Sequence, residues 1–350
     1  MTVLVFMLSL FPVRGGRVPG APVPWKRVFR RAGAAGGAVG SGGCGTRSPG
    51  RRLGWVIDVP EELAASQAKY NGEAGRAFVA ALPGRAEEFL GRWGLRLAGP
   101  SMHGVASLVL PVRRADGTPA ALKLQLLDEE SEGEPVALRA WGGDGAVRLL
   151  EHDPETGTML LERADERRHL SRHGDEREAV RVLAGLLARL SALPAPPGLR
   201  RLDAIAGRML ARVPAATARL GAGDAALLAD CAAAVREVAA EPGDRLLHWD
   251  LHYDNVLGAE REPWLAIDPK PLAGDPGFEL LPALTDLWNP DPAEIRWRFD
   301  LLTERLGLDR ERALAWTLGR VLQNGLWDVE DGEPALDADQ VVIARALLAR

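Results

Sequence analysis

The spacing of apolar residues changes along the chain, and this change restricts the possible folds more than any other feature. Between residues 105 and 164 the apolar residues occur in short runs separated by the turn dipeptides Asp116-Gly117 and Thr156-Gly157. Such a pattern is typical of antiparallel hairpins. After residue 175 nearly every segment has helical spacing. We therefore expect an α+β fold with an antiparallel-sheet N-lobe, a mostly helical C-lobe and a cleft between them.

Individual elements can be placed within this division. Two helices are expected first, at about residues 59–71 and 73–93, and a third at 129–141. The expected strands cover residues 105–114, 119–127, 146–153 and 157–164. Two short apolar stretches that contain Asp, at 245–258 and 263–270, interrupt the helical half. We expect the N-lobe to span 56–165 and the C-lobe 166–350.

Residues 1–55 differ from the remainder in composition. They are rich in Gly, Pro and Arg, and they hold nine of the 43 Lys and Arg residues but none of the 48 Asp and Glu residues. Such a segment buries too little apolar surface to offset the entropy of ordering, so we expect a disordered extension. The opening apolar run lacks the basic start and the cleavage site of a signal peptide. A start codon assigned too far upstream is the explanation that we favour.

Composition excludes several classes of protein. No apolar run approaches the roughly 20 residues of a membrane-spanning helix, and Cys44 and Cys231 are too far apart in a cysteine-poor chain to indicate a disulfide framework or a zinc ribbon. Residues 56–350 hold 34 basic and 48 acidic residues, a net charge of −14, which argues against nucleic acid as a partner. We expect a cytoplasmic protein with a small-molecule partner; no sequence feature indicates an oligomeric state.

The segment from His248 to Asn255, HWDLHYDN, carries the most specific signal for chemistry. It places the carboxylate of Asp250 five residues before the carboxamide of Asn255, which is the spacing of a kinase catalytic loop. The carboxylate would accept the proton of a substrate hydroxyl, and the amide oxygen would bind magnesium without adding charge. His248 and His252 are expected to shape the loop by hydrogen bonds.

Two more residues complete this pattern. Asp268 ends the apolar run WLAI eighteen residues after Asp250, where a carboxylate can hold magnesium against nucleotide phosphates. Lys123 alternates with the leucines of ALKLQL, so it faces away from them, as a phosphate-binding lysine would. A Gly-rich phosphate loop is not evident, and residues 101–107 are the best candidate for the loop that covers the nucleotide.

These stretches together resemble the aminoglycoside and hydroxyurea phosphotransferase family, in particular its streptomycin 6-kinase branch, which has a protein-kinase-like fold. The resemblance covers roughly residues 59–340 and rests on ALKLQL, LLHWDLHYDNVL and REPWLAIDPKPLAGDPGFELLPAL. It implies Asp250 as catalytic base, Asn255 and Asp268 as magnesium ligands, and Lys123 as phosphate anchor with Glu134 as its partner. It also implies ATP, or another nucleoside triphosphate, and Mg²⁺ as cofactors, and a role in antibiotic resistance or secondary metabolism.

The sequence leaves alternatives open. Four other acidic residues near Glu134 compete for the pairing with Lys123, namely Asp128, Glu129, Glu130 and Glu132. The alternation of His and Asp at positions 248, 250, 252 and 254 would suit a metal-dependent hydrolase, and a nucleotide-binding pseudokinase is a further possibility. Protein-kinase regulation is not expected, because Trp249 replaces the Arg that reads an activation-loop phosphate.

The acidic character of the helical half predicts the acceptor. Carboxylates beside Asp250 would attract a streptomycin-like cation and would offer little to neutral hydroxyurea. Some of the acidic residues of the helical half are expected to line the cleft; they include Asp275, Glu279, Asp286, Asp328, Glu330 and Asp331. Asp275 is equally compatible with a structural role as a helix cap. Trp288, Trp297, Trp316 and Trp327 are expected to pack in the core rather than to stack on substrate.

Overall fold

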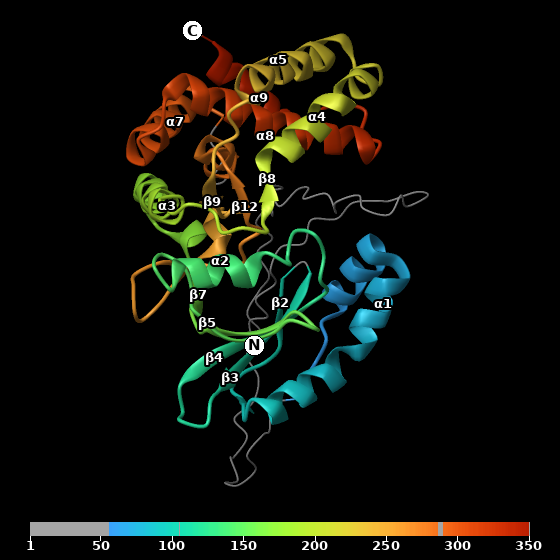
Figure 1. Ribbon diagram of the computed structural model, residues 1–350, viewed down its shortest axis with the longest axis vertical. Helices are drawn as coiled ribbons and strands as arrows, with labels where there is room; N and C mark the ends of the chain where they lie inside the picture. The colour runs from blue at the N-terminus through green and yellow to red at the C-terminus, as the bar shows by residue number, and fades with distance from the viewer. Residues whose placement is uncertain (1–55, 105, 286–289, 350) are drawn as a thin grey trace, which may run out of the picture.

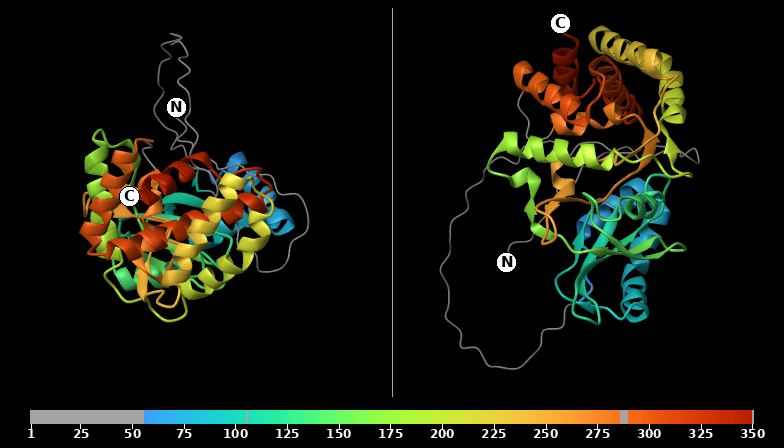
Figure 2. Two further views of the ribbon diagram at one scale, coloured as in Figure 1. Left: turned by 90° about the horizontal axis from the view of Figure 1, so that it is seen from above. Right: turned by 60° about the vertical axis from the view of Figure 1, so that its left-hand side comes forward.

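The computed structural model describes residues 56–104, 106–285 and 290–349. An antiparallel sheet and one long helix lie at one end of the molecule, and the helices that follow residue 175 gather at the other (Figures 1 and 2). The α+β arrangement expected from the sequence is therefore confirmed. Residues 1–55, for which we expected disorder, lie outside the described residues.

Helix α1 (Glu61–Arg92) is broken at Gly72, where φ is 57°. Glycine adopts this left-handed conformation without the steric cost that a Cβ atom would add. The two helices predicted from the sequence are therefore two arms of one element. The second arm packs Phe78, Leu82 and Phe89 against the sheet. In Figure 1, α1 runs beside the strands.

The main sheet has six strands and is antiparallel throughout. Its order is β1-β3-β4-β6-β5. On the edge of β3 that β1 occupies, β2 pairs with the beginning of β3 and β1 with its end. The bounds are β1 (Arg96–Leu97), β2 (Met102–His103), β3 (Ser107–Arg113), β4 (Pro119–Gln125), β5 (Leu149–Asp153) and β6 (Thr158–Glu162). Each expected hairpin is present, and Gly117 supplies the positive φ, 86°, that the first turn requires.

Alternation along β4 gives the sheet two different faces. Leu122 and Leu124 are fully buried in the cluster that includes α1. Ala121 and Lys123 face the other way and line a cleft. Because successive side chains of a strand point to opposite faces, packing the leucines on α1 directs Lys123 into the cleft.

Helix α2 (Glu134–Trp141) is shorter than the helix expected at 129–141. Residues 129–133 form turns, in which the Asp128 carboxylate accepts hydrogen bonds from the backbone N–H groups of Glu130 and Ser131. Such side-chain bonds compete with helical pairing. The helix begins only where Pro135, which fits a first turn, follows Glu134.

The second half is built around helix α8, most of which is buried and which packs against α4, α5 and α9. Trp316 and Trp327 are almost fully buried on α8 and Trp297 packs against the same core, as expected, whereas Trp288 lies outside the described residues. The bounds are α3 (Glu176–Leu190), α4 (Leu202–Thr217), α5 (Ala222–Val238), α6 (Leu281–Thr285), α7 (Pro292–Leu306), α8 (Arg310–Glu330) and α9 (Ala338–Leu348).

Two small sheets hold the loops between these parts. One has the order β11-β10-β7 and the other β8-β12-β9. Their strands are β7 (Asp165–His169), β8 (Arg200–Arg201), β9 (Arg245–Leu247), β10 (Val256–Gly258), β11 (Leu265–Ala266) and β12 (Leu272–Gly274). The loop with Asp250 and Asn255 joins β9 to β10, and Asp268 follows β11. Both loops are therefore anchored at strand ends.

Candidate active site

A cleft with a volume of about 350 Å³ lies between the main sheet and the helical half. Its walls come from α1, the main sheet, the loops after β9 and β11, and helices α8 and α9. Lys123, Asp250, Asn255 and Asp268 all line it. Glu134 is fully buried behind Lys123. The structure thus brings together all five site residues that the sequence predicted.

Lys123 and Glu134 form an ion pair at the base of the cleft. The Lys123 Nζ lies 2.7 Å from both carboxylate oxygens of Glu134. Gln125, on the same face of β4, donates to Glu134 Oε2 over 3.1 Å. Of the other acidic residues that the sequence allowed as partners of Lys123, Glu130 instead forms an ion pair with Arg200. The contact fixes the direction of the lysine ammonium.

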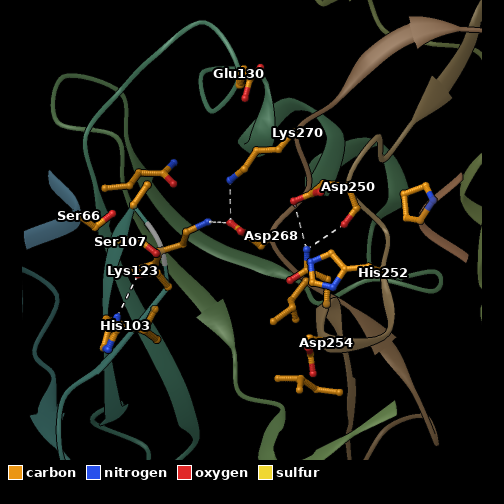
Figure 3. A pocket seen from close by; sticks show the side chains of 18 of the residues that line it. Ser66, His103, Ser107, Lys123, Glu130, Asp250, His252, Asp254, Asp268 and Lys270 are labelled. Carbon is orange, nitrogen blue, oxygen red and sulfur yellow. Dashed lines mark hydrogen bonds and ion pairs between the residues drawn. The ribbon is translucent and has the colours of Figure 1, made fainter. Parts of the chain in front are cut away.

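Asp268 lies at the meeting point of two lysines. Its Oδ1 accepts from Lys123 Nζ over 2.5 Å and from Lys270 Nζ over 3.0 Å (Figure 3). Burial acts to raise the pKa of the Asp268 carboxyl, but the two ammonium groups hold that pKa well below its ordinary value. The backbone of Asp268 has a φ of 57°, an uncommon conformation for a residue other than glycine. Such strain is characteristic of functional sites.

Asp250 and Asn255 are joined within one tight loop. Asn255 Nδ2 donates to the Asp250 carbonyl oxygen over 2.9 Å, and the backbone N–H groups of His252 and Asn255 close successive turns. These bonds orient the Asn255 amide so that its oxygen faces away from the Asp250 backbone. Burial raises the pKa of Asp250 above its ordinary value, which makes the carboxylate a stronger base.

The residue before Asp250 is held in an unusual conformation. Trp249 has a φ of 65°, and its backbone N–H donates to the buried carboxylate of Glu279. The guanidinium groups of Arg200 and Arg320 each lie over the Trp249 ring, 4.5 Å from its centroid. Burial raises the pKa of Glu279 to about 7. The sequence did not identify Glu279, Arg200 and Arg320 as supports of Trp249, because residues this far apart in the chain form no recognisable motif.

The two histidines near Asp250 do not form a metal cluster with it. His248 is fully buried, its Nε2 lies 3.0 Å from the Ile267 carbonyl oxygen, and burial lowers its pKa to about 3. Asp254 accepts from the Ser171 hydroxyl instead of facing Asp250. Within the described ranges, no three His, Cys, Asp or Glu side chains are placed to hold a metal ion. The geometry does not favour the hydrolase hypothesis.

One side of the cleft is apolar. Val109, Ala121 and Leu161 come from strands β3, β4 and β6, and Leu257 and Ile267 come from the β10–β11 region. Residues 102–104 and 106–107, within the expected nucleotide-covering loop, border the same space. Two apolar layers that enclose a slot are suited to a flat aromatic base.

Another part of the lining lies along α8 and the start of α9, where Asp328, Asp337 and Asp339 form an acidic wall. Arg320, Asn324 and Asp328 are spaced four residues apart, so they lie along one stripe of the helix. Asp337 and Asp339 at the start of α9 extend this wall. Over the described residues, ten Asp or Glu but four Lys or Arg line the whole cleft.

Of the acidic residues that the sequence suggested, some of which were expected to line the cleft, the structure places one there. Asp328 lines the cleft as expected, but Asp275 caps a short helix and pairs with Arg312. Glu279 supports Trp249, and Glu330 pairs with Arg212. Glu330 and Asp331, at the end of α8, do not line the cleft, and Asp286 lies outside the described residues. Charge alone could not separate cleft-lining carboxylates from caps and ion pairs.

Comparison with known proteins gives consistent matches. Residues 92–332 match the family described as aminoglycoside/hydroxyurea antibiotic resistance kinase. The chain is 65% identical to a hydroxyurea phosphotransferase of Kitasatospora aureofaciens, over 86% of this chain and 88% of that protein. It is 58% identical to a streptomycin 6-kinase of Streptomyces glaucescens, over 83% of this chain and 97% of that protein.

A solved structure from Thermobifida fusca, designated a fructosamine-3-kinase, aligns with a TM-score of 0.52. The alignment covers 76% of this chain and 98% of the other at 23% identity. At this identity the likeness shows the fold alone, and it confirms the expected kinase-like, bilobal architecture. Of the helices that the structure describes, none is long and apolar enough to span a membrane.

Proposed function

This chain belongs to the aminoglycoside/hydroxyurea antibiotic resistance kinase family, and on that premise we propose that it moves the γ-phosphoryl group of ATP onto a hydroxyl of a cationic, streptomycin-like acceptor. As a member of this family it is a phosphotransferase with a hydroxyl-type acceptor. The finer assignments below concern the nucleotide, the catalytic residues and the acceptor. The acidic wall along α8 and α9 carries the choice of acceptor.

The residues of the cleft fit a magnesium nucleotide. The oxygens of Asn255 and Asp268 are the hard ligands that magnesium prefers, and hydrogen bonds already orient both side chains. Bound magnesium would neutralise charge on the β and γ phosphates. Lys123, held by Glu134, would bind phosphate oxygens, while the apolar slot would take the adenine.

Asp250 is the proposed base. Its side chain is buried and faces the cleft, so it can orient an acceptor hydroxyl toward the phosphate and take its proton. The new bond forms between the hydroxyl oxygen and the γ phosphorus as the bond to ADP breaks. Burial excludes bulk water that would otherwise compete as acceptor.

The acceptor would lie along the face of α8 that begins at Arg320, a residue whose charge acts on Asp250. From there the stripe leads through Asn324 to Asp328 and the first turn of α9. Asp337 also caps α9, so part of its charge serves the helix. The carboxylates of Asp328 and Asp339 would attract guanidinium or amine groups and would offer little to a neutral molecule.

Hydroxyurea is the second candidate acceptor, favoured by the 65% identity to a hydroxyurea phosphotransferase. It is small and uncharged, so it would use Asp250 without the acidic wall. The two candidates therefore differ in their dependence on charge.

Steady-state kinetics with each acceptor decides between them. We expect a higher kcat/KM for streptomycin, with a KM that rises between low and moderate ionic strength because salt screens the carboxylates. The variant Asp339→Asn should raise the streptomycin KM several-fold, since a partly exposed charge contact contributes up to about 1 kcal/mol. Asp300→Asn, an equal charge change on exposed α7, is the control. An equal or reversed preference, or a salt-independent KM for streptomycin, would refute the proposed acceptor.

Three further proposals concern the roles of the two lobes, the cellular location of the enzyme and its biological effect. We propose that residues 56–165 act as the nucleotide-binding lobe and 166–350 as the lobe that carries the catalytic loop and the acceptor site. We also propose that the enzyme works in the cytoplasm, where ATP is available. Its action on an antibiotic would confer resistance.

A further inference from the structure

Lys270 occupies a position that the proposed roles of the other site residues leave unused. It lines the cleft, it is 5% exposed, and its Nζ lies 3.0 Å from Asp268 Oδ1. The same oxygen accepts from Lys123 Nζ over 2.5 Å. The two ammonium groups therefore border the same point in the cleft, one extending from the main sheet and the other from the helical half (Figure 3).

The backbone around Lys270 is held on both sides. Its N–H donates to the His248 carbonyl oxygen over 3.0 Å, and its own carbonyl accepts from Arg200 over 3.1 Å. Pro269 and Pro271 flank it, and proline fixes one backbone dihedral and restricts the residue before it. With the backbone held, only the side-chain torsions of Lys270 need to adjust when a ligand binds, which keeps the reorganisation small.

The charges of the cleft indicate what Lys270 binds. Without ligand, the carboxylates of Glu134 and Asp268 balance the ammonium groups of Lys123 and Lys270. Lys123 also contacts both carboxylate oxygens of Glu134, so it has a second anionic partner besides Asp268. When Asp268 takes a cation, its attraction for Lys270 weakens, and an anion arriving with that cation is the natural replacement. A nucleotide phosphate is such an anion.

The loop that should cover the phosphates strengthens this argument. Gly104 is the one glycine between the described parts of β2 and β3. Loops that cradle phosphates by backbone N–H groups alone need several glycines to approach closely. Side-chain cations must therefore supply more of the neutralising charge here. Arg163 and Arg320, the other two cations of the described cleft, contact Glu166 and Gln323.

We infer that Lys270 is a second phosphate-binding residue, whose ammonium passes from Asp268 to the γ-phosphate oxygens of the nucleotide and remains there during transfer. This inference rests on the proposed function. As the bond from the acceptor oxygen to phosphorus forms and the bond to ADP breaks, the hydroxyl proton goes to Asp250. The ammonium keeps its protons and stabilises the charge on the phosphoryl oxygens.

Nucleotide binding measured by calorimetry tests the inference without any turnover. The ligands are the β,γ-imido analogue of ATP, ADP and adenosine, each with magnesium. For Lys270→Met we expect the analogue to bind roughly 10- to 100-fold more weakly, the value of a hydrogen bond between charged groups. ADP should weaken much less and adenosine not at all. Lys270→Arg keeps the charge and should retain most of the preference for the analogue.

The controls separate a binding role from a structural one. Arg201→Met removes an equal charge from a side chain that is 56% exposed on strand β8, and it should bind all three ligands normally. Equal losses of affinity for the analogue and ADP in Lys270→Met, or unchanged affinity for the analogue, would overturn the inference and leave the proposed function intact. If the unmodified chain bound no magnesium nucleotide, the proposed function would fail together with it. Melting temperatures of both Lys270 variants show whether either substitution impairs folding. If Lys270→Met does not fold, the affinities of Lys270→Arg for the three ligands test the inference instead.

Discussion

Replacing Glu279 with Gln should change how the stability of the protein depends on pH. The Glu279 side chain is 2% exposed, and one carboxylate oxygen accepts from the backbone N–H of Trp249. Burial raises the pKa of this carboxyl from 4.5 to about 7. A glutamine keeps the shape and an accepting oxygen but cannot ionise.

The sign and size follow from proton linkage. Because the folded state holds the proton more tightly than the unfolded state, Glu279 contributes stability below pH 4.5. That contribution is lost as pH rises through about 7. At about 1.4 kcal/mol per unit of pKa, the loss is roughly 3 kcal/mol. The Gln variant lacks this loss, so the difference in unfolding free energy, variant minus wild type, should rise by about that amount between pH 4.5 and pH 8.

Urea unfolding at several pH values measures the effect. Each protein is compared with itself across pH, so a constant cost of the substitution cancels. Glu241→Gln, on a largely exposed side chain, serves as the control and should leave the pH profile of the wild type unchanged. A difference between Glu279→Gln and wild type that stays constant from pH 4.5 to pH 8 would refute the reasoning.

Two further predictions concern the chemistry. Asp250→Asn should leave folding and nucleotide binding intact and lower kcat by ~10² to 10⁴, the contribution of a positioned base; near-normal turnover would remove Asp250 from the mechanism. Asp268→Ala should abolish the dependence of ATP affinity on magnesium, because it removes the anionic ligand. If magnesium still increased the ATP affinity of this variant as much as it does in the wild type, that assignment would be contradicted.

The sequence predicted best where a residue's role follows from local periodicity. Lys123 was placed on the cleft face because it alternates with Leu122 and Leu124, and the structure packs those leucines on α1. The spacing of Asp250 and Asn255 likewise specified one loop. In contrast, the start of α2 was placed five residues too early, because the turn that Asp128 caps reads as helix in a run of acidic residues.

Residues that act across the fold could not be predicted in this way. Lys270 adjoins Asp268 in sequence, but its direction depends on hydrogen bonds to His248 and Arg200. Glu279 looks like any acidic residue before a helix until Trp249 is placed against it. The acidic wall combines α8 with α9, which only tertiary packing brings together.

The break in α1 gives one helix two tasks. The arm after Gly72 packs Phe78, Leu82 and Phe89 on the main sheet. The arm before it contributes Ser66 and Gln67 to the cleft, while its Leu63 joins the same apolar cluster as the second arm. The surface that faces the ligand and the core of the sheet are therefore linked through a single continuous element.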